Sequence, residues 1–259
     1  HYIITASAKQ TVITHHKFIL IHGLFFGNLA GWFPLITQAL TKYGDVLCYD
    51  LRGHGLSEVP SSGYHLSSHL NDLTELIKEV GWETESMYFI GHSFGARLAL
   101  ALLCERQRQD QANDRMILID PPLLTENHDD QRLFEELKAI GIDGLSEHIP
   151  SSLMLVFTKE GRRLKKMFKR WRRLIEETTF LDEIDRLGDV NNEELSSIQS
   201  HGSVLFGSES GCIRAHPLLE PLLPSSRLHI ISEGGHFLLN QCPEMVLIFI
   251  EKQLLGDHL

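Results

Sequence analysis

The chain has 259 residues, of which 42% are hydrophobic and 22% charged, as expected for a globular protein of one large domain with or without an insertion. Its net charge of −10 argues against nucleic acid as a partner. Four scattered cysteines without C-x-x-C spacing predict reduced thiols in a cytoplasmic protein, with neither a disulfide framework nor a metal site. No apolar run reaches the length of a transmembrane span, and no signal segment opens the chain.

Strand and helix patterns alternate along most of the chain. The patterns predict strands at 2–5, 11–14, 17–21, 46–49, 87–90, 116–119, 203–207 and 228–231. The first two strands are spaced as a hairpin. Helices are predicted at 33–40, 66–80, 94–104 and 243–255. This alternation predicts an α/β fold with a mostly parallel central sheet and helices on both faces.

The alternation is interrupted between residues 123 and 200, where the sequence is helical and charged without a strong strand signal. We therefore predict a helical cap, or lid, inserted at 123–200 into a core domain made of 1–122 and 201–259.

The stretch around Ser93 is the strongest chemical signal. Met87 to Ile90 is an apolar strand, Gly91-His92-Ser93-Phe94-Gly95 matches G-x-S-x-G, and a buried helix rich in Ala and Leu follows. A serine on a sharp turn between strand and helix is strained and exposed, and the helix N-terminus favours an anion beside it. Ser93 is therefore a candidate nucleophile.

Four motifs in one order carry a family resemblance. They are His22-Gly23, Asp50-x-Arg52-Gly53-His54-Gly55-x-Ser57, Gly91-x-Ser93-x-Gly95 and Gly235-His236-Phe237. With these motifs the chain resembles the α/β-hydrolase superfamily over nearly all of its length outside the cap. The stretch from Gly91 to Arg97 is also similar to a menaquinone-pathway branch, whose members perform an elimination.

The resemblance assigns a role to each matching residue. Ser93 is the nucleophile, and His236, on the loop after the last strand, is its base. The backbone N–H groups of Leu24 and Phe94 hold the oxyanion. The superfamily's remaining motif histidines, His22, His54 and His92, are expected to brace the turns of the site.

The third member of the triad departs from the family pattern. The usual acid lies in a Gly-x-x-Asp turn after the strand that follows the cap, but here the turn reads Gly207-Ser208-Glu209-Ser210. Two substitutes are open: Asp120, where some branches carry their acid, and Glu209 with its longer side chain. We favour Asp120, with Glu209 second and a missing acid third.

Residues 162–173 hold eight Lys or Arg and no acid. On a helical wheel their apolar neighbours, Trp171 among them, fall on one side. The simplest interpretation is a cap helix that buries this side over the active site and leaves its charges in water. The alternatives are contact with an acidic carrier protein, coenzyme A phosphates, an anionic membrane surface or a substrate carboxylate.

The leading hypothesis is a cofactor-independent serine hydrolase that cleaves an ester or thioester of a small-molecule acyl substrate through an acyl-enzyme. The acyl group is expected to be partly apolar, with Phe25, Phe26 and Trp171 as wall residues. One alternative is elimination or carbon–carbon cleavage at the same site. Another is a non-catalytic ligand-binding protein on a hydrolase scaffold.

Overall fold

The computed structural model describes the whole chain except residues 8–14, 25–26, 111–112, 124–160, 185–189 and 257–259; of 161–168 it describes the backbone only. Within the described ranges, seven strands form one sheet in the order β1-β3-β2-β4-β5-β6-β7. The strands are β1 (Tyr2–Thr5), β2 (His16–Ile21), β3 (Gly44–Tyr49), β4 (Met87–His92), β5 (Arg115–Ile119), β6 (Gly202–Gly207) and β7 (Leu228–Ile231). All neighbours pair in parallel except β1, which is antiparallel to β3.

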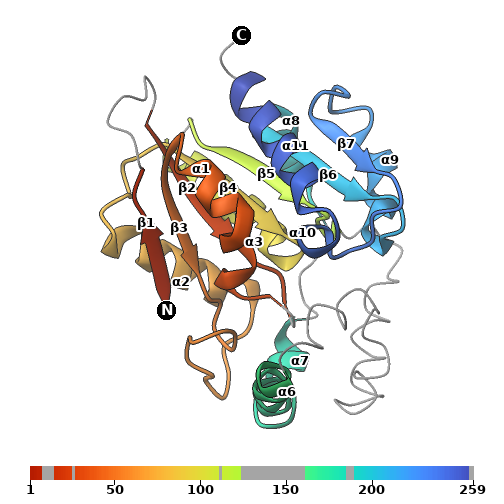
Figure 1. Cartoon of the computed structure of the whole chain (residues 1–259). Coiled ribbons are helices and arrows are strands. Elements are labelled where there is room, and N and C mark those ends of the chain that lie inside the picture. The colour runs from red at the N-terminus through yellow and green to blue at the C-terminus, as the bar shows by residue number, and fades with distance from the viewer. Residues whose placement is uncertain (8–14, 25–26, 111–112, 124–160, 185–189, 257–259) are drawn as a thin grey trace.

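Helices cover both faces of this sheet, and Figure 1 shows α1 and α11 in front of it. The helices on this front face are η1 (Leu29–Trp32), η2 (Phe33–Thr37), α1 (Gln38–Leu40), α10 (Leu238–Gln241) and α11 (Pro243–Gly256). The elements packed into the opposite layer are α2 (Leu66–Glu79), α3 (Phe94–Arg108), α8 (Asn192–His201), η3 (Gly211–Ala215) and α9 (His216–Leu219). The predicted α/β architecture is thereby confirmed.

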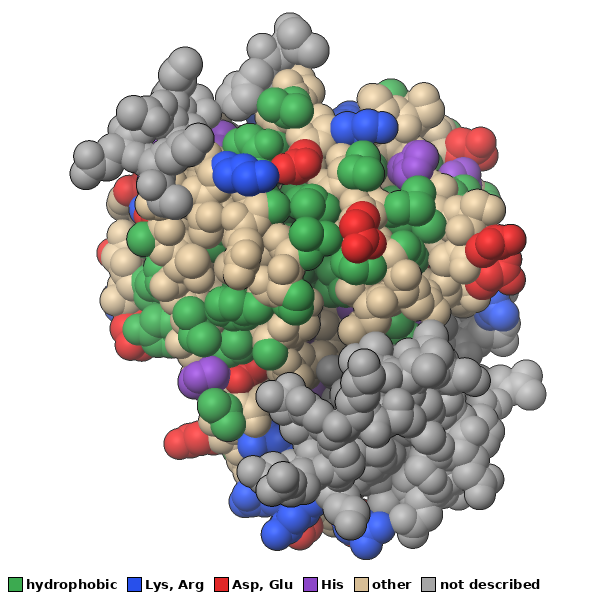
Figure 2. Space-filling model, in the orientation of Figure 1, with side chains coloured by type: hydrophobic (Ala, Val, Ile, Leu, Met, Phe, Trp, Pro, Cys, Tyr) green, Lys and Arg blue, Asp and Glu red, His purple; other side chains and the backbone are tan. Residues whose placement is uncertain are grey.

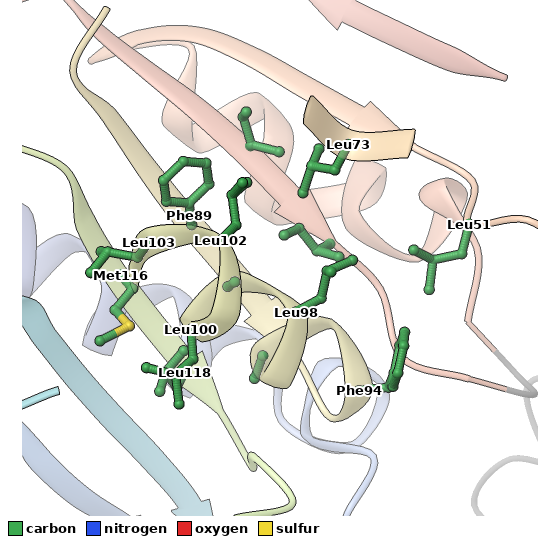
Figure 3. Packing of buried hydrophobic residues seen from close by; sticks show 14 of the residues in the cluster. Leu51, Leu73, Phe89, Phe94, Leu98, Leu100, Leu102, Leu103, Met116 and Leu118 are labelled. Carbon is green, nitrogen blue, oxygen red and sulfur yellow. The ribbon is translucent and has the colours of Figure 1, made fainter. Parts of the chain in front are cut away.

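Each face of the sheet has its own apolar core, because strands buried on both sides alternate their side chains between two layers. Helix α3 is buried along almost its whole length, as the Ala- and Leu-rich sequence predicts. Figure 3 shows its leucines, Leu98 and Leu102 among them, packed between the sheet and the neighbouring elements. The turn that carries Ser93 is therefore held by a strand and a helix that are both fixed in the core.

One expectation at the N-terminal end stays a prediction, and another needs correction. Strand β1 pairs with β3, through Tyr2 opposite Tyr49, and so belongs to the main sheet as an edge strand. Its predicted hairpin partner, 11–14, lies outside the described residues. The predicted helix at 33–40 is divided into a π-helical turn, Phe33–Thr37, and a short α-helix, Gln38–Leu40, and a 3₁₀ turn, Leu29–Trp32, precedes it.

Two further helices, α6 (Gly161–Glu176) and α7 (Phe180–Ile184), lie beyond the carboxyl ends of the parallel strands (Figure 1). Leu174 and Trp171 on α6 are buried, whereas Lys169, Arg172 and Arg173 are exposed. Figure 2 shows Lys and Arg side chains gathered at α6. Residues 124–160 and 185–189 of the predicted cap lie outside the described residues, so its boundaries stay a prediction. No helix in the described ranges has the length and apolarity to cross a bilayer.

One side chain fastens α6 to the core. Arg170 donates from Nε to the carbonyl of Gly53 over 3.0 Å, and from its terminal nitrogen to the carbonyl of Ser57. Both carbonyls belong to the turn after β3, so this arginine of the basic segment is already engaged within the protein.

Candidate active site

Ser93 lies on the tight turn between β4 and α3 with φ 55° and ψ −125°. A non-glycine residue in that conformation is strained, and such strain persists only where the surroundings enforce it. Here the N–H of Ser93 donates to the carbonyl of Ile119 on β5 over 2.9 Å. A Cβ on Gly91 would lie 2.2 Å from the carbonyl oxygen of Gly95, and one on Gly95 equally close to that of Ile21. Both motif glycines are required by these backbone approaches.

The structure brings Ser93, His236 and Asp120 together from three separate segments. The hydroxyl of Ser93 lies 2.8 Å from Nε2 of His236, and Nδ1 of that ring lies 2.5 Å from Oδ2 of Asp120. Because a carboxylate only accepts hydrogen bonds, Nδ1 carries the proton and Nε2 presents its lone pair to the serine. This is the geometry in which an imidazole can take a proton from a hydroxyl.

Asp120 is fully buried just after β5, and its carboxylate accepts three hydrogen bonds from the described residues. Besides His236, it accepts from the N–H of Gly207 at Oδ1 over 3.1 Å and from the hydroxyl of Ser210 at Oδ2. Ser210, at the position where the family pattern expects an acid, thus donates to the carboxylate of Asp120. Glu209, the second candidate, is exposed and accepts from the Ser208 hydroxyl.

The two expected oxyanion donors belong to segments that adjoin Ser93. Phe94 is the first residue of α3, where an α-helix offers its N–H no acceptor. The loop that carries Leu24 approaches from the end of β2, since a Cβ on Gly23 would lie 2.9 Å from that of Ser93. His22 fixes this loop, because its Nδ1–H donates to the Gly23 carbonyl over 2.7 Å and its Nε2 accepts from the N–H of Leu51 over 3.0 Å.

The other motif histidines brace the site without contacting the serine hydroxyl. Nε2–H of His92 donates to the carbonyl of His236 over 2.7 Å and so holds the loop of the candidate base. His54 donates from Nδ1 to the carbonyl of Arg52, and its ring lies 5.4 Å from that of His22. Burial lowers the pKa of His22 and of His92 to about 4, and that of His54 to about 3. These three rings are therefore neutral at pH 7.

Two neighbours of the site were not found from the sequence. Cys212 lies with its Sγ 3.7 Å from Nδ1 of His236, and Ser210 bonds Asp120. The departure from Gly-x-x-Asp marked position 210, but nothing in the sequence connected either residue to Asp120. In the described ranges, one set of three side chains could hold a metal ion: Asp120, Cys212 and His236. The proposed wall residues Phe25 and Phe26 lie outside the described residues.

Arg97, in the stretch similar to the menaquinone-pathway branch, does not lie free at the site. It is 3% exposed and forms a two-pronged ion pair with Glu194 of α8, one prong of which measures 3.2 Å.

The fold and this arrangement define an α/β-hydrolase with a serine at the nucleophile turn. A family profile described as "alpha/beta hydrolase fold" matches residues 17–189, and the chain belongs to that family. Among curated proteins, it is similar to a 2-(acetamidomethylene)succinate hydrolase from Mesorhizobium japonicum, with 26% identity over 155 residues. The match covers 55% of this chain and 53% of that enzyme, so the chain spans about half the length of this relative.

Two solved structures share the fold over nearly their whole length. A thermophilic esterase from Thermogutta terrifontis, solved with malate bound, has a TM-score of 0.68 and 19% identity, with 100% of both chains covered. MenH from S. aureus has a TM-score of 0.66 and 16% identity, covering 98% of this chain and 99% of its own.

Proposed function

We propose that this protein is a serine hydrolase that cleaves an ester or thioester through an acyl-enzyme. The observation that carries the proposal is the unbroken chain of hydrogen bonds from Ser93 through His236 to the buried carboxylate of Asp120. A strained serine with an oriented base is the arrangement that nucleophilic acyl transfer needs.

The steps follow from the positions of these groups. Ser93 Oγ attacks the substrate carbonyl while Nε2 of His236 takes its proton, and the N–H groups of Leu24 and Phe94 bind the oxyanion. The imidazolium, stabilised by Asp120, gives that proton to the leaving alcohol or thiol as the carbon–heteroatom bond breaks. Water, deprotonated by His236, then attacks the acyl-enzyme, and Ser93 regains its proton as the acid departs.

The substrate we propose carries an anionic or carrier-linked acyl group. The sequence of α6 is strongly basic, and Lys169, Arg172 and Arg173 are exposed on it. The hydrolase from Mesorhizobium is named for a succinate derivative, and the Thermogutta esterase holds malate. Coenzyme A thioesters and acyl groups on an acidic carrier protein share this negative charge. An anionic membrane surface is the remaining alternative for the basic segment.

The catalytic proposal is tested by a fluorophosphonate probe, which labels activated serines. We expect intact-mass spectrometry to show one adduct on the wild type and none on Ser93→Ala. Ser196→Ala, at an exposed serine of α8, is the matched control and should label like the wild type. A folded wild-type protein that takes up no probe would contradict the proposal.

The substrate class is tested by removing charge from the basic segment. Changing Arg162, Arg163, Lys166 and Lys169 together to Gln is expected to raise KM for an anionic acyl thioester and leave KM for a neutral short ester nearly unchanged. Equal changes for both substrates would show that the segment does not bind the anion.

Elimination is the second candidate, favoured by the similarity of Gly91 to Arg97 to the menaquinone-pathway branch and by the fold shared with MenH. In such a reaction His236 and Ser93 would remove a proton and no acyl-enzyme would form. The pairing of Arg97 with Glu194 speaks against a guanidinium that is free to bind a substrate carboxylate. Rapid-quench mass spectrometry of the turnover of an ester distinguishes the two, since only hydrolysis leaves an acyl group on Ser93.

A further inference from the structure

Three side chains of kinds that bind metal ions lie close together at the candidate active site, and one of them is the candidate base. Asp120, Cys212 and His236 each offer one ligand atom, and these atoms lie within 4.8 Å of one another. The thiol of Cys212 faces the same ring nitrogen, Nδ1 of His236, that bonds Asp120. The carboxylate is fully buried, whereas the imidazole is 32% exposed, so an ion can approach from the side of His236.

The spacing suits a small tetrahedral ion. Ligand bonds of about 2.3 Å to sulfur and about 2.0 Å to nitrogen place those two atoms about 3.5 Å apart. The separation of Cys212 Sγ from His236 Nδ1 is 3.7 Å. Nitrogen and oxygen ligands of such an ion lie about 3.3 Å apart, so the 2.5 Å contact between His236 and Asp120 must open as the ion replaces the shared proton.

We propose that Asp120, Cys212 and His236 form a binding site for Zn²⁺, and that the bound ion switches the enzyme off. A thiolate, an imidazole and a carboxylate are a donor set that zinc prefers over the hard cations Mg²⁺ and Ca²⁺. On binding, the Cys212 thiol releases its proton to solvent, the ring proton of His236 is exchanged from Nδ1 to Nε2, and the fourth position is left to water.

The inhibitory consequence follows from what the ion displaces, and it rests on the function proposed above. With Nδ1 bound to the metal, His236 loses its hydrogen bond to Asp120. Nε2 then carries the ring proton and has no lone pair with which to take the proton of Ser93. Ser210 loses its acceptor as well, because its hydroxyl bonds the same oxygen of Asp120.

Binding is tested first, with readouts that do not depend on activity. Isothermal titration of the full chain with ZnCl₂ should show a site whose affinity falls at least tenfold in Cys212→Ser. CoCl₂ should produce a sulfur-to-cobalt charge-transfer band in the near ultraviolet that Cys212→Ser lacks. Cys242→Ser is the matched control, since Cys242 is the other half-buried thiol. It should keep both the zinc affinity and the band.

Inhibition is tested separately by the rate of fluorophosphonate labelling. Zn²⁺ should slow labelling of the wild type at least tenfold, and each variant is compared with its own metal-free rate. Mg²⁺ should not slow it. Unchanged zinc affinity in Cys212→Ser would overturn the site. Zinc that binds through Cys212 without slowing the labelling of a protein that labels normally when metal-free would overturn the switch and leave the proposed hydrolase function standing.

Discussion

Asp120 receives its support from the turn that holds the acid in the usual family pattern. Its Oδ1 accepts from the Gly207 N–H, and its Oδ2 from the hydroxyl of Ser210, so the turn after β6 supplies donors where the pattern has a carboxylate. Each oxygen of the buried Asp120 carboxylate therefore has a hydrogen-bond partner, as a buried polar group needs.

Replacing this carboxylate tests the role that the geometry suggests. Asp120→Asn keeps the shape but removes the charge that stabilises the imidazolium, and we expect the rate of fluorophosphonate labelling to fall by about 10²- to 10⁴-fold. Ser210→Ala leaves the carboxylate in place and should reduce the rate less. Glu209→Gln, at an exposed side chain, should label like the wild type. A slow Glu209→Gln beside a fast Asp120→Asn would assign the acid to Glu209 instead.

The neutral histidines make stability depend on pH in a defined direction. Burial lowers the pKa of His22 and His92 to about 4 and that of His54 to about 3, from 6.5 in the unfolded chain. Between these values the unfolded chain binds more protons than the native one, so the free energy of unfolding rises with pH. Stability should therefore be complete above pH 6.5 and be lost as pH falls toward 4.

Urea unfolding between pH 4 and pH 7 measures this slope. Each such histidine contributes up to about 1.4 kcal/mol per pH unit. His92→Gln should therefore unfold with a shallower pH dependence than the wild type. His229→Gln, at an exposed residue of β7, should keep the wild-type slope. An unchanged slope in His92→Gln would mean that this ring titrates alike in both states.

At the scale of elements, helix α6 is seated on the turn that follows β3. Gly53 in this turn has φ +82°, and a Cβ there would lie 2.7 Å from Cδ1 of Leu174 and 3.1 Å from Tyr64. The same turn accepts both hydrogen bonds of Arg170 and contains His54, whose ring neighbours that of His22. The packing of α6 is thus linked through His54 and His22 to the loop that carries Leu24.

Gly53→Ala should measurably weaken the packing of α6 on this turn. The positive φ costs a residue with a Cβ about 1 kcal/mol, and crowding a packed contact costs typically 1–3 kcal/mol more. Gly81→Ala separates the two effects, because Gly81 has φ +71° and nothing within 4 Å of its Cβ position. We expect Gly53→Ala to lower the free energy of unfolding by more than Gly81→Ala in urea titrations. Equal losses of unfolding free energy in the two variants would show that α6 shifts to make room for the new methyl group without destabilising the protein.

For the molecule as a whole, local sequence patterns predicted the features that depend on neighbouring residues in the chain, namely the buried strands and the turn around Ser93. The apolar runs that became β2, β4, β5 and β6 are buried on both faces, and the glycines around Ser93 are needed for close backbone contacts, so both features are visible in sequence. The pairing of β1 with β3 could not be predicted, because an edge strand has the same sequence pattern whether it pairs with a hairpin neighbour or with a distant strand. Contacts between distant segments, such as Ser210 with Asp120, leave no periodic signal.

The ion pair of Arg97 and Glu194 is another such contact, and it joins helix α3 to helix α8. Arg97 lies on α3 directly after the nucleophile turn, and Glu194 lies on α8, which leads back into β6. Glu194 also closes a capping box with Asn191 at the start of α8. Both charges are buried, at 3% and 7% exposure, and Nε of Arg97 has no partner among the described residues.

Breaking this pair from one side should destabilise the whole fold. Glu194→Ala leaves the Arg97 charge buried without its partner, which costs about 3–5 kcal/mol. Replacing both residues, as Arg97→Met with Glu194→Leu, should recover much of that loss, since an apolar pair of similar size avoids the desolvation of two charges. Glu193→Ala is the control, at the residue before Glu194. It removes an exposed ion pair with Arg108 and should change the urea midpoint little.

The same series separates stability from chemistry. If the Arg97 pair is structural, the double variant folds and labels with the fluorophosphonate probe at the wild-type rate, because neither side chain touches Ser93, His236 or Asp120 among the described contacts. A double variant that is as stable as the wild type but no longer labels or turns over substrate would instead show that the guanidinium takes part in the reaction. That result would favour the elimination mechanism over hydrolysis.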